Sequence, residues 1–70
     1  MQKWEYLTLN CVYWSLTLLV EEINGEKPDA KLPLRSVLAR LGGEGWEMIN
    51  MYHLESEGNR QIVVLKRPAE

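Results

Sequence analysis

The first third of the chain is dominated by residues that favour β-strands. From Lys3 to Ile23 the sequence is rich in Leu, Val, Thr, Tyr and Trp, and its apolar residues do not keep a helical spacing. A single strand of that length would reach roughly 65 Å at about 3.3 Å per residue, which is too long for so small a domain. The chain must therefore turn back, and we predict strands Lys3–Cys11 and Leu16–Ile23, with the turn between Asn10 and Ser15.

A turn signal and a helical pattern follow. Asn24-Gly25 supplies the backbone freedom of a turn, and Pro28 ends strand pairing soon afterwards, so we interpret "EKPDAK" as a loop that leads to a helix. Pro33 suits the first turn of a helix. The apolar residues after it recur at positions i, i+3, i+4 and i+7, which predicts a short helix with one apolar stripe. This stripe consists of Leu34, Val37, Leu38 and Leu41.

The last part of the chain predicts two more strands. Trp46 to Leu54 alternates between two sets of side chains, "ESEGNR" has the composition of a chain reversal, and Gln61 to Arg67 alternates again. The predicted order is therefore β-β-α-β-β in a single α+β domain, residues 1–70. Its simplest form is a four-stranded antiparallel sheet with one helix packed on one face.

Both faces of this predicted sheet carry apolar side chains. An antiparallel sheet with one face in water usually alternates apolar and polar residues, but these strands do not. One short helix can cover only one face, so the other would leave a larger apolar patch than soluble monomers usually tolerate. We expect a second copy of the chain to cover it. The candidate interaction surface consists of Trp4, Tyr6, Trp14, Leu19, Ile23, Tyr52, Ile62 and Val64.

Composition and charge argue against several classes of function. The 70-residue chain has 46% hydrophobic residues and a net charge of −2, so it should fold, and it has no positive field to attract nucleic acid. RNA-binding sheets with exposed aromatic residues carry a Phe-rich strand signature, and this chain has no Phe. The uncharged stretch from Tyr6 to Val20 is too short and too polar for a membrane span. We therefore expect a reduced, cytoplasmic location, with no nucleic-acid or membrane partner.

The cysteine and histidine content limits both the cross-links that could stabilise the fold and the catalytic groups that the chain could offer. Cys11 is the only cysteine and His53 the only histidine, so we expect neither a disulfide nor a structural zinc site. Oligomerisation is the remaining common way to stabilise so small a domain. The two residues could act as nucleophile and base only if they met in space, and no oxyanion donor is evident. A buried free thiol and a surface histidine are the simpler interpretation.

The segment "LGGEGWE", Leu41–Glu47, invites comparison with a phosphate-binding loop. Such loops lead from a strand into the N-terminus of a helix, whereas this one follows a helix, where the backbone offers carbonyl groups. We interpret Gly42 or Gly43 as a left-handed helix cap. Gly45 then permits a tight start to the next strand, which Trp46 anchors by packing.

Three carboxylates accompany these motifs. Glu5, Glu44 and Glu47 could in principle supply an acid–base pair, if two of them lie close together. A cross-strand ion pair is the more ordinary role for such residues. The available basic partners of Glu5 and Glu47 are Lys3, Lys66 and Arg67. We therefore predict no catalytic residues and no enzyme activity.

Three short segments resemble one known family. "KWEY" at Lys3–Tyr6, "LGGEGWE" at Leu41–Glu47 and "LKRP" at Leu65–Pro68 together resemble small bacterial and phage-associated domains, domain of unknown function family 4177. The likeness spans nearly the whole chain, and the G-x-E-G-W-E element is its most distinctive part. The chain departs from the shortest members by an extra segment at about Val12–Leu32. The resemblance implies a compact α+β fold and supplies no reaction, cofactor or catalytic residue.

Two functions from different classes are compatible with these patterns. The first is a small non-enzymatic module that self-associates, as a dimer by preference, through the aromatic sheet face or an edge strand, and that can offer the assembly to another protein. The second is a small-ligand-binding domain with an aromatic-lined pocket at the sheet–helix junction or between subunits. Its pocket would be framed by Trp4, Tyr6, Trp46 and Tyr52.

Overall fold

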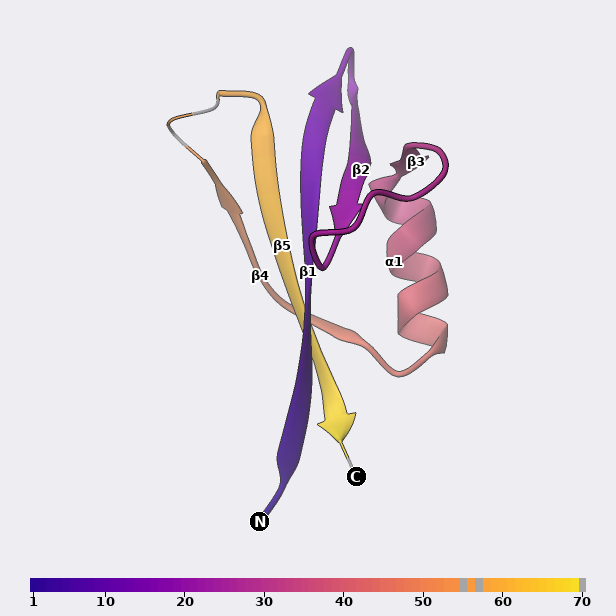
Figure 1. Ribbon diagram of the computed structural model, residues 1–70, viewed down its shortest axis with the longest axis vertical. Helices are drawn as coiled ribbons and strands as arrows, with labels where there is room; N and C mark the ends of the chain where they lie inside the picture. Colours follow the sequence, from indigo (N-terminus) through magenta and orange to yellow (C-terminus); the bar gives the residue numbers. More distant parts are fainter. Residues whose placement is uncertain (55, 57, 70) are drawn as a thin grey trace.

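The chain folds into one antiparallel sheet with a helix on one side. The computed structural model describes residues 1–54, 56 and 58–69. Within these residues the sheet has five strands in the order β3-β2-β1-β5-β4, with the two chain ends close together at one end (Figure 1). The elements are β1 Lys3–Trp14, β2 Thr17–Ile23, β3 Leu32–Pro33, α1 Leu34–Gly43, β4 Glu47–His53 and β5 Arg60–Ala69.

The prediction of a four-stranded sheet is wrong, because a short fifth strand precedes the helix. β3 contains only Leu32 and Pro33, which pair with Val20 and Leu19 of β2. Two residues are too few to show an alternating pattern, and Pro33 suggested only a helix start. A proline is tolerated here because β3 lies at the edge of the sheet, where a missing N–H breaks no ladder. The order of elements is therefore β-β-β-α-β-β.

The first hairpin turns later than predicted. β1 continues to Trp14, and Ser15 and Leu16 alone connect it to β2. Ser15 has a φ of 59°, a left-handed conformation that a tight hairpin turn requires and that glycine usually supplies. The predicted range from Asn10 to Ser15 missed the turn because no Gly or Pro marks it.

The predicted Asn24-Gly25 turn is confirmed. Both residues have positive φ, 51° and 82°, and the hydrogen bonds between Ile23 and Glu26 close the turn. Asn24 also ties this turn to β1, since its N–H donates to the Thr8 carbonyl and its Oδ1 accepts the Thr8 N–H, both at 2.8 Å.

The core lies between α1 and one face of the sheet. The helix packs along the β2–β3 side, as Figure 1 shows. The buried residues of the helix pack against alternate residues of β1, β2 and β5, as the apolar stripe predicts. The buried set comprises Leu7, Leu9, Cys11, Val20, Leu34, Val37, Leu41, Val63 and Leu65.

The helix ends in a Schellman motif whose left-handed residue is Gly45. The Trp46 N–H donates to the Leu41 carbonyl at 3.0 Å, and the Gly45 N–H donates to the Gly42 carbonyl at 3.1 Å. Gly45 has a φ of 91°, and Trp46 packs against the core directly after it. The expectation that Gly42 or Gly43 is left-handed is therefore wrong, because the helix runs through both residues before it stops.

We predict opposite effects of alanine at two neighbouring glycines. Gly45→Ala should destabilise the fold by more than about 1 kcal/mol, because Ala disfavours positive φ. Gly43→Ala should instead stabilise it by about 0.5–1 kcal/mol, because Gly43 is helical. An added Cβ would meet nothing within 4 Å at either position, so the comparison isolates the backbone term. Urea unfolding of both variants measures the two changes in the free energy of unfolding. Equal changes would contradict this account of the helix cap.

Candidate functional site

The face of the sheet that α1 leaves uncovered is the main candidate site, and we call it the open face. In β1 the odd-numbered residues Leu7, Leu9 and Cys11 are buried under the helix, so the even-numbered residues point the other way. Pairing with β5 extends this face sideways, since Thr8 lies opposite Val64.

Aromatic and aliphatic side chains cover much of the open face. The exposed fractions are 41% for Trp4, 60% for Tyr6, 72% for Trp14 and 46% for Tyr52. Strand register places four half-buried aliphatic residues among them: Val12, Leu19, Ile62 and Val64. Seven of the eight residues expected in the interaction surface thus share this face.

Ile23 is the residue that departs from the expected surface. It pairs with Leu9 and packs against the core on the helix-covered face. The reason is a β-bulge, since Asn10 pairs with Glu22 whereas Cys11 pairs with Val20, which leaves Glu21 without a partner position. The extra residue shifts the alternation by one, so Val20 and Ile23 reach the same face.

The bulge also builds a polar network on the open face. Arg60 Nη1 lies 2.6 Å from Glu21 Oε1 and donates a 2.9 Å hydrogen bond to Asn10 Oδ1. Lys31 Nζ approaches Glu21 Oε2 at 3.3 Å, and Asn10 Nδ2 donates to Glu22 Oε1 at 3.4 Å. The hydrogen bond from Arg60, supported by Lys31, holds the pKa of Glu21 below its usual value.

At the end of the sheet that holds the chain termini, two adjacent basic residues stack on two tryptophans. Lys66 Nζ lies 4.2 Å from the ring centre of Trp4, and the guanidinium of Arg67 lies 4.4 Å from that of Trp46. Because neighbouring strand residues point to opposite faces, one pair lies on the open face and the other on the helix-covered face.

Arg67 joins the three segments that carry the family resemblance. Its Nε lies 3.1 Å from Glu5 Oε2, and its Nη1 donates to the Glu44 carbonyl at 3.0 Å, near the C-terminus of α1. With the Trp46 stack, these contacts bring "KWEY", "LGGEGWE" and "LKRP" together at one point. The Glu5–Arg67 contact confirms the expected cross-strand ion pair.

The structure does not bring the candidate catalytic residues together. Glu5 and Glu47 lie on strands that flank β5, opposite Arg67 and Lys66 respectively. Cys11 and His53 also flank β5, on either side of Gln61, and their strands are therefore about 10 Å apart. Neither pair can exchange a proton directly across β5.

Cys11 and His53 each have a different local role. Cys11 is fully buried, and burial raises the pKa of its thiol to about 11. His53 is exposed and its Nε2 donates to the Gly58 carbonyl at 2.7 Å, which ties β4 to the following loop. The thiol is therefore a core group, and the histidine a surface group.

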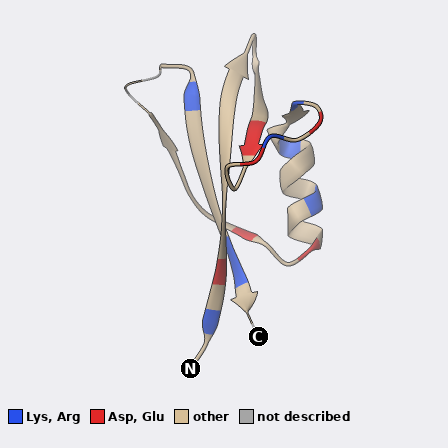
Figure 2. Cartoon of the chain, viewed as in Figure 1, with Lys and Arg blue, Asp and Glu red and all other residues tan. Residues whose placement is uncertain are grey.

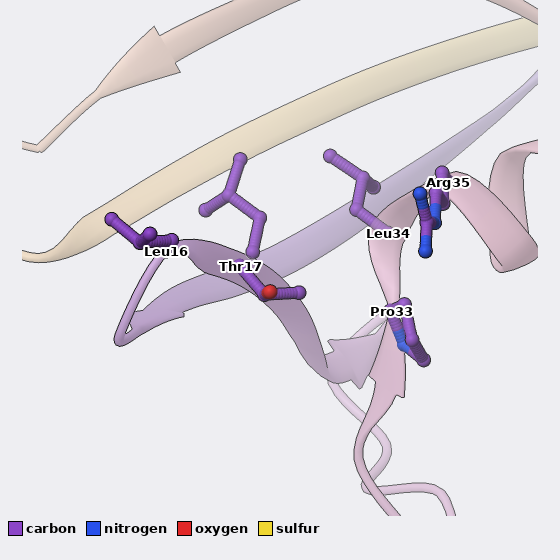
Figure 3. Close-up of a pocket in the computed structure, with 6 residues that line it drawn as sticks. Leu16, Thr17, Pro33, Leu34 and Arg35 are labelled. Atoms are coloured by element: carbon purple, nitrogen blue, oxygen red, sulfur yellow. The ribbon is translucent and has the colours of Figure 1, made fainter.

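A pocket of about 320 Å³ lies at the sheet–helix junction, but it is not the expected aromatic one. Figure 3 shows Leu16 and Thr17 from the first hairpin on one side, with Pro33 of β3 and Leu34 and Arg35 from the start of α1 on the other. Its lining includes none of the four aromatic residues expected to frame a ligand pocket. Trp46 packs against the core under the helix, whereas Trp4, Tyr6 and Tyr52 lie on the open face.

The outer edge of β4 is a weaker candidate than the open face. All seven of its residues are exposed, including Met48 at 49% and Met51 at 41%. However, a bulge between Met48 and Asn50 interrupts the strand, and the Met51 N–H already donates to Asn50 Oδ1 at 2.8 Å. Such features hinder the addition of another strand.

The remaining surface offers few alternatives. In Figure 2 the basic and acidic residues among the described part of the chain are interspersed along the ribbon. Within residues 1–54, 56 and 58–69, no cluster of three or more His, Cys, Asp or Glu side chains could hold a metal ion. The same part of the chain contains no helix of the length and hydrophobicity that crossing a membrane requires.

Comparison of the chain with protein-family models, with curated proteins and with solved structures found no significant match.

Sequence patterns missed the polar part of the site. Asn10, Glu21 and Arg60 are far apart in sequence, and the bulge that joins them has no Gly to signal it. Val12 was assigned to a turn and therefore omitted from the surface. The consecutive Lys66-Arg67 pair and the three tryptophans were visible signals for the cation–π contacts.

Glu21 should make stability depend on acidity. Because its folded pKa is lowered, its contribution is present above the usual value near 4.5 and is lost as pH falls through the lower folded value. Glu21→Gln should lower the thermal midpoint at pH 7 by roughly 5 °C, with the difference shrinking towards pH 3. Glu22→Gln, which makes the same change of charge at a carboxylate that accepts only a longer hydrogen bond from Asn10, is the control. Calorimetry across this range tests the idea, and an undiminished difference at pH 3 would contradict it.

The Cys11 thiol should react only when the fold opens. At pH 8 the native protein should react with a chromogenic disulfide reagent at least about a hundredfold more slowly than the unfolded chain, because the thiol is buried and its pKa is about 11. Leu16→Cys in a Cys11→Ala background, at a side chain that is 97% exposed, is the fast-reacting control. The raised pKa also predicts stability that is fully present below pH 9.0 and falls towards pH 11. Equal native and unfolded rates would show that Cys11 is accessible.

Proposed function

We propose that this chain is a small non-enzymatic module that associates with a second copy of itself through the open face. The observation that carries the proposal is the exposure of Trp4, Tyr6, Trp14 and Tyr52 on a sheet face that no other element of the described residues covers. Tyrosine and tryptophan are enriched at the centres of protein interfaces, where they contribute most of the binding energy.

The size of the open face fits such an association. β1, β2, β4 and β5 have 12, 7, 7 and 10 residues, and at about 3.3 Å per residue and about 4.8 Å per strand they present a face of roughly 570 Å². Monomers rarely expose an apolar patch of more than about 300–600 Å², and a standard interface takes about 800 Å² from each partner. The open face, which also carries charged residues, is therefore large enough for a small interface. A two-fold pair would cover the same face on both copies.

A ligand-binding function has less support. The aromatic residues that would frame its pocket are divided between the two faces of the sheet, and the junction pocket is open and lined partly by polar groups. An enzyme has less support still, because the carboxylates, the thiol and the imidazole are held apart.

We also propose a family and a cellular location for this chain. Membership of domain of unknown function family 4177 rests on the three motif segments, and the contacts of Arg67 with Glu5, Glu44 and Trp46 give these segments a common structural role. The free, buried thiol of Cys11 is compatible with a reducing bacterial cytoplasm.

Analytical ultracentrifugation tests the association. The wild-type chain should sediment as a dimer at tens of micromolar and dissociate on dilution. Tyr6→Glu should shift it to the monomer, because it removes an aromatic contact and the interface would desolvate the new carboxylate even with Lys66 opposite it. Ser36→Glu, which adds the same charge at an exposed helical position, should leave the dimer intact. A wild-type chain that stays monomeric throughout would refute the proposed function.

A further inference from the structure

The two halves of the open face differ in shape. Towards the chain termini β1 exposes 41% of Trp4, whose ring lies 4.2 Å from Lys66 Nζ, and 60% of Tyr6. Towards the first hairpin the same face contains a depression of about 400 Å³. This depression is lined by Val12, Tyr13, Trp14, Leu19, Lys31 and Asn59.

Thr8 lies midway between these two features. Trp4 precedes it by four residues in β1 and Val12 follows it by four, so both lie about 13 Å from it along the strand. The Trp4 side chain and the depression are therefore placed symmetrically about one point on the face. A two-fold axis that lies parallel to the sheet and crosses β1 at right angles there would exchange the two positions.

We propose, on the basis of the self-association proposed above, that two copies stack face to face in antiparallel orientation about an axis near Thr8. Trp4 of each copy then fills the depression beside Val12 and Leu19 of the other. Sheets that pack face to face lie about 10 Å apart, a gap that interdigitating side chains fill. The parallel alternative, with the axis along β1, would set Trp4 against Trp4 and leave both depressions empty.

The same axis gives the polar network a partner. Tyr6 precedes Thr8 by two residues and Asn10 follows it by two, so Tyr6 of one copy lies over Asn10 of the other. Asn10 accepts from Arg60 and donates to Glu22. The Tyr6 hydroxyl can hydrogen-bond to this network, which is what polar groups require when an interface covers them.

The area supports a second copy as the occupant. The four aromatic side chains are 41–72% exposed, so covering them would bury roughly 330–550 Å² at about 150–250 Å² for each whole side chain. The half-buried aliphatic residues between them bring this area closer to the roughly 800 Å² that each partner contributes to a standard interface. Charge is compatible as well, because Lys66, Arg60 and Lys31 on this face are interspersed with Glu47, Glu21 and Glu22.

A double-mutant cycle on the dimer dissociation constant tests the orientation. Within one chain Trp4 and Leu19 are about 26 Å apart, because Leu19 lies opposite Val12, so they cannot interact directly. In the antiparallel dimer they touch across the interface. Trp4→Ala and Leu19→Ala should each raise the dissociation constant by about tenfold or more, and the double variant by clearly less than the product of the two effects.

The controls separate this inference from the proposed function. Leu16→Ala, at a turn residue outside the contact, should leave the dissociation constant unchanged, and near-UV circular dichroism should show that each variant is folded. If the Trp4→Ala variant does not fold, Trp4→Leu takes its place in the same double-mutant cycle. Strict additivity, or no effect of Leu19→Ala, would overturn the antiparallel orientation while the dimer stands. A monomeric wild-type chain would overturn both proposals.

Discussion

The pairing of β1 with β5 is the constraint on which the rest of the structure depends. It joins the first and last strands of the chain from Lys3–Ala69 to Val12–Arg60, and both other long strands attach to its outer edges. Its register puts Leu7 and Leu9 beside Leu65 and Val63 under the helix, and it turns Tyr6 and Thr8 to the open face. A shift of one residue would exchange the two faces and expose the core. The core and the candidate interface are thus two consequences of one ladder.

The β-bulge in β2 is the second feature that determines which side chains reach each face of the sheet. By inserting Glu21 it lets Val20 and Ile23 both pack into the core, and it places a carboxylate where Arg60 can reach it. The open face therefore has a charged network beside its aromatic residues, and the network gives the face defined polar positions. At the opposite end Arg67 holds the helix terminus, the start of β4 and the start of β1 together. Self-association about these fixed positions is the function that we propose.

Predictions from pattern succeeded where the signal was local. The stripe from Leu34 to Leu41 predicted the helix, and the alternation after Trp46 predicted β4. They failed where no characteristic residue or period in the sequence indicates the backbone conformation. Ser15 turns the hairpin without glycine, and β3 is too short to show a period. The "LGGEGWE" segment is a helix stop as expected, but Gly45 rather than Gly42 or Gly43 takes the left-handed conformation, because helix propensity alone does not specify the last residue.

By itself, the sequence determined the α+β class, the single helix and the excess of apolar side chains over what one helix can cover, because composition and periodicity are properties of the chain alone. Only the tertiary structure decided the fifth strand, the face to which Ile23 belongs and the meeting of Asn10, Glu21 and Arg60. These features depend on strand register and on a bulge, and both result from contacts between residues that are distant in sequence. The open face is therefore foreseeable as a surplus of apolar residues, whereas its shape is a product of pairing.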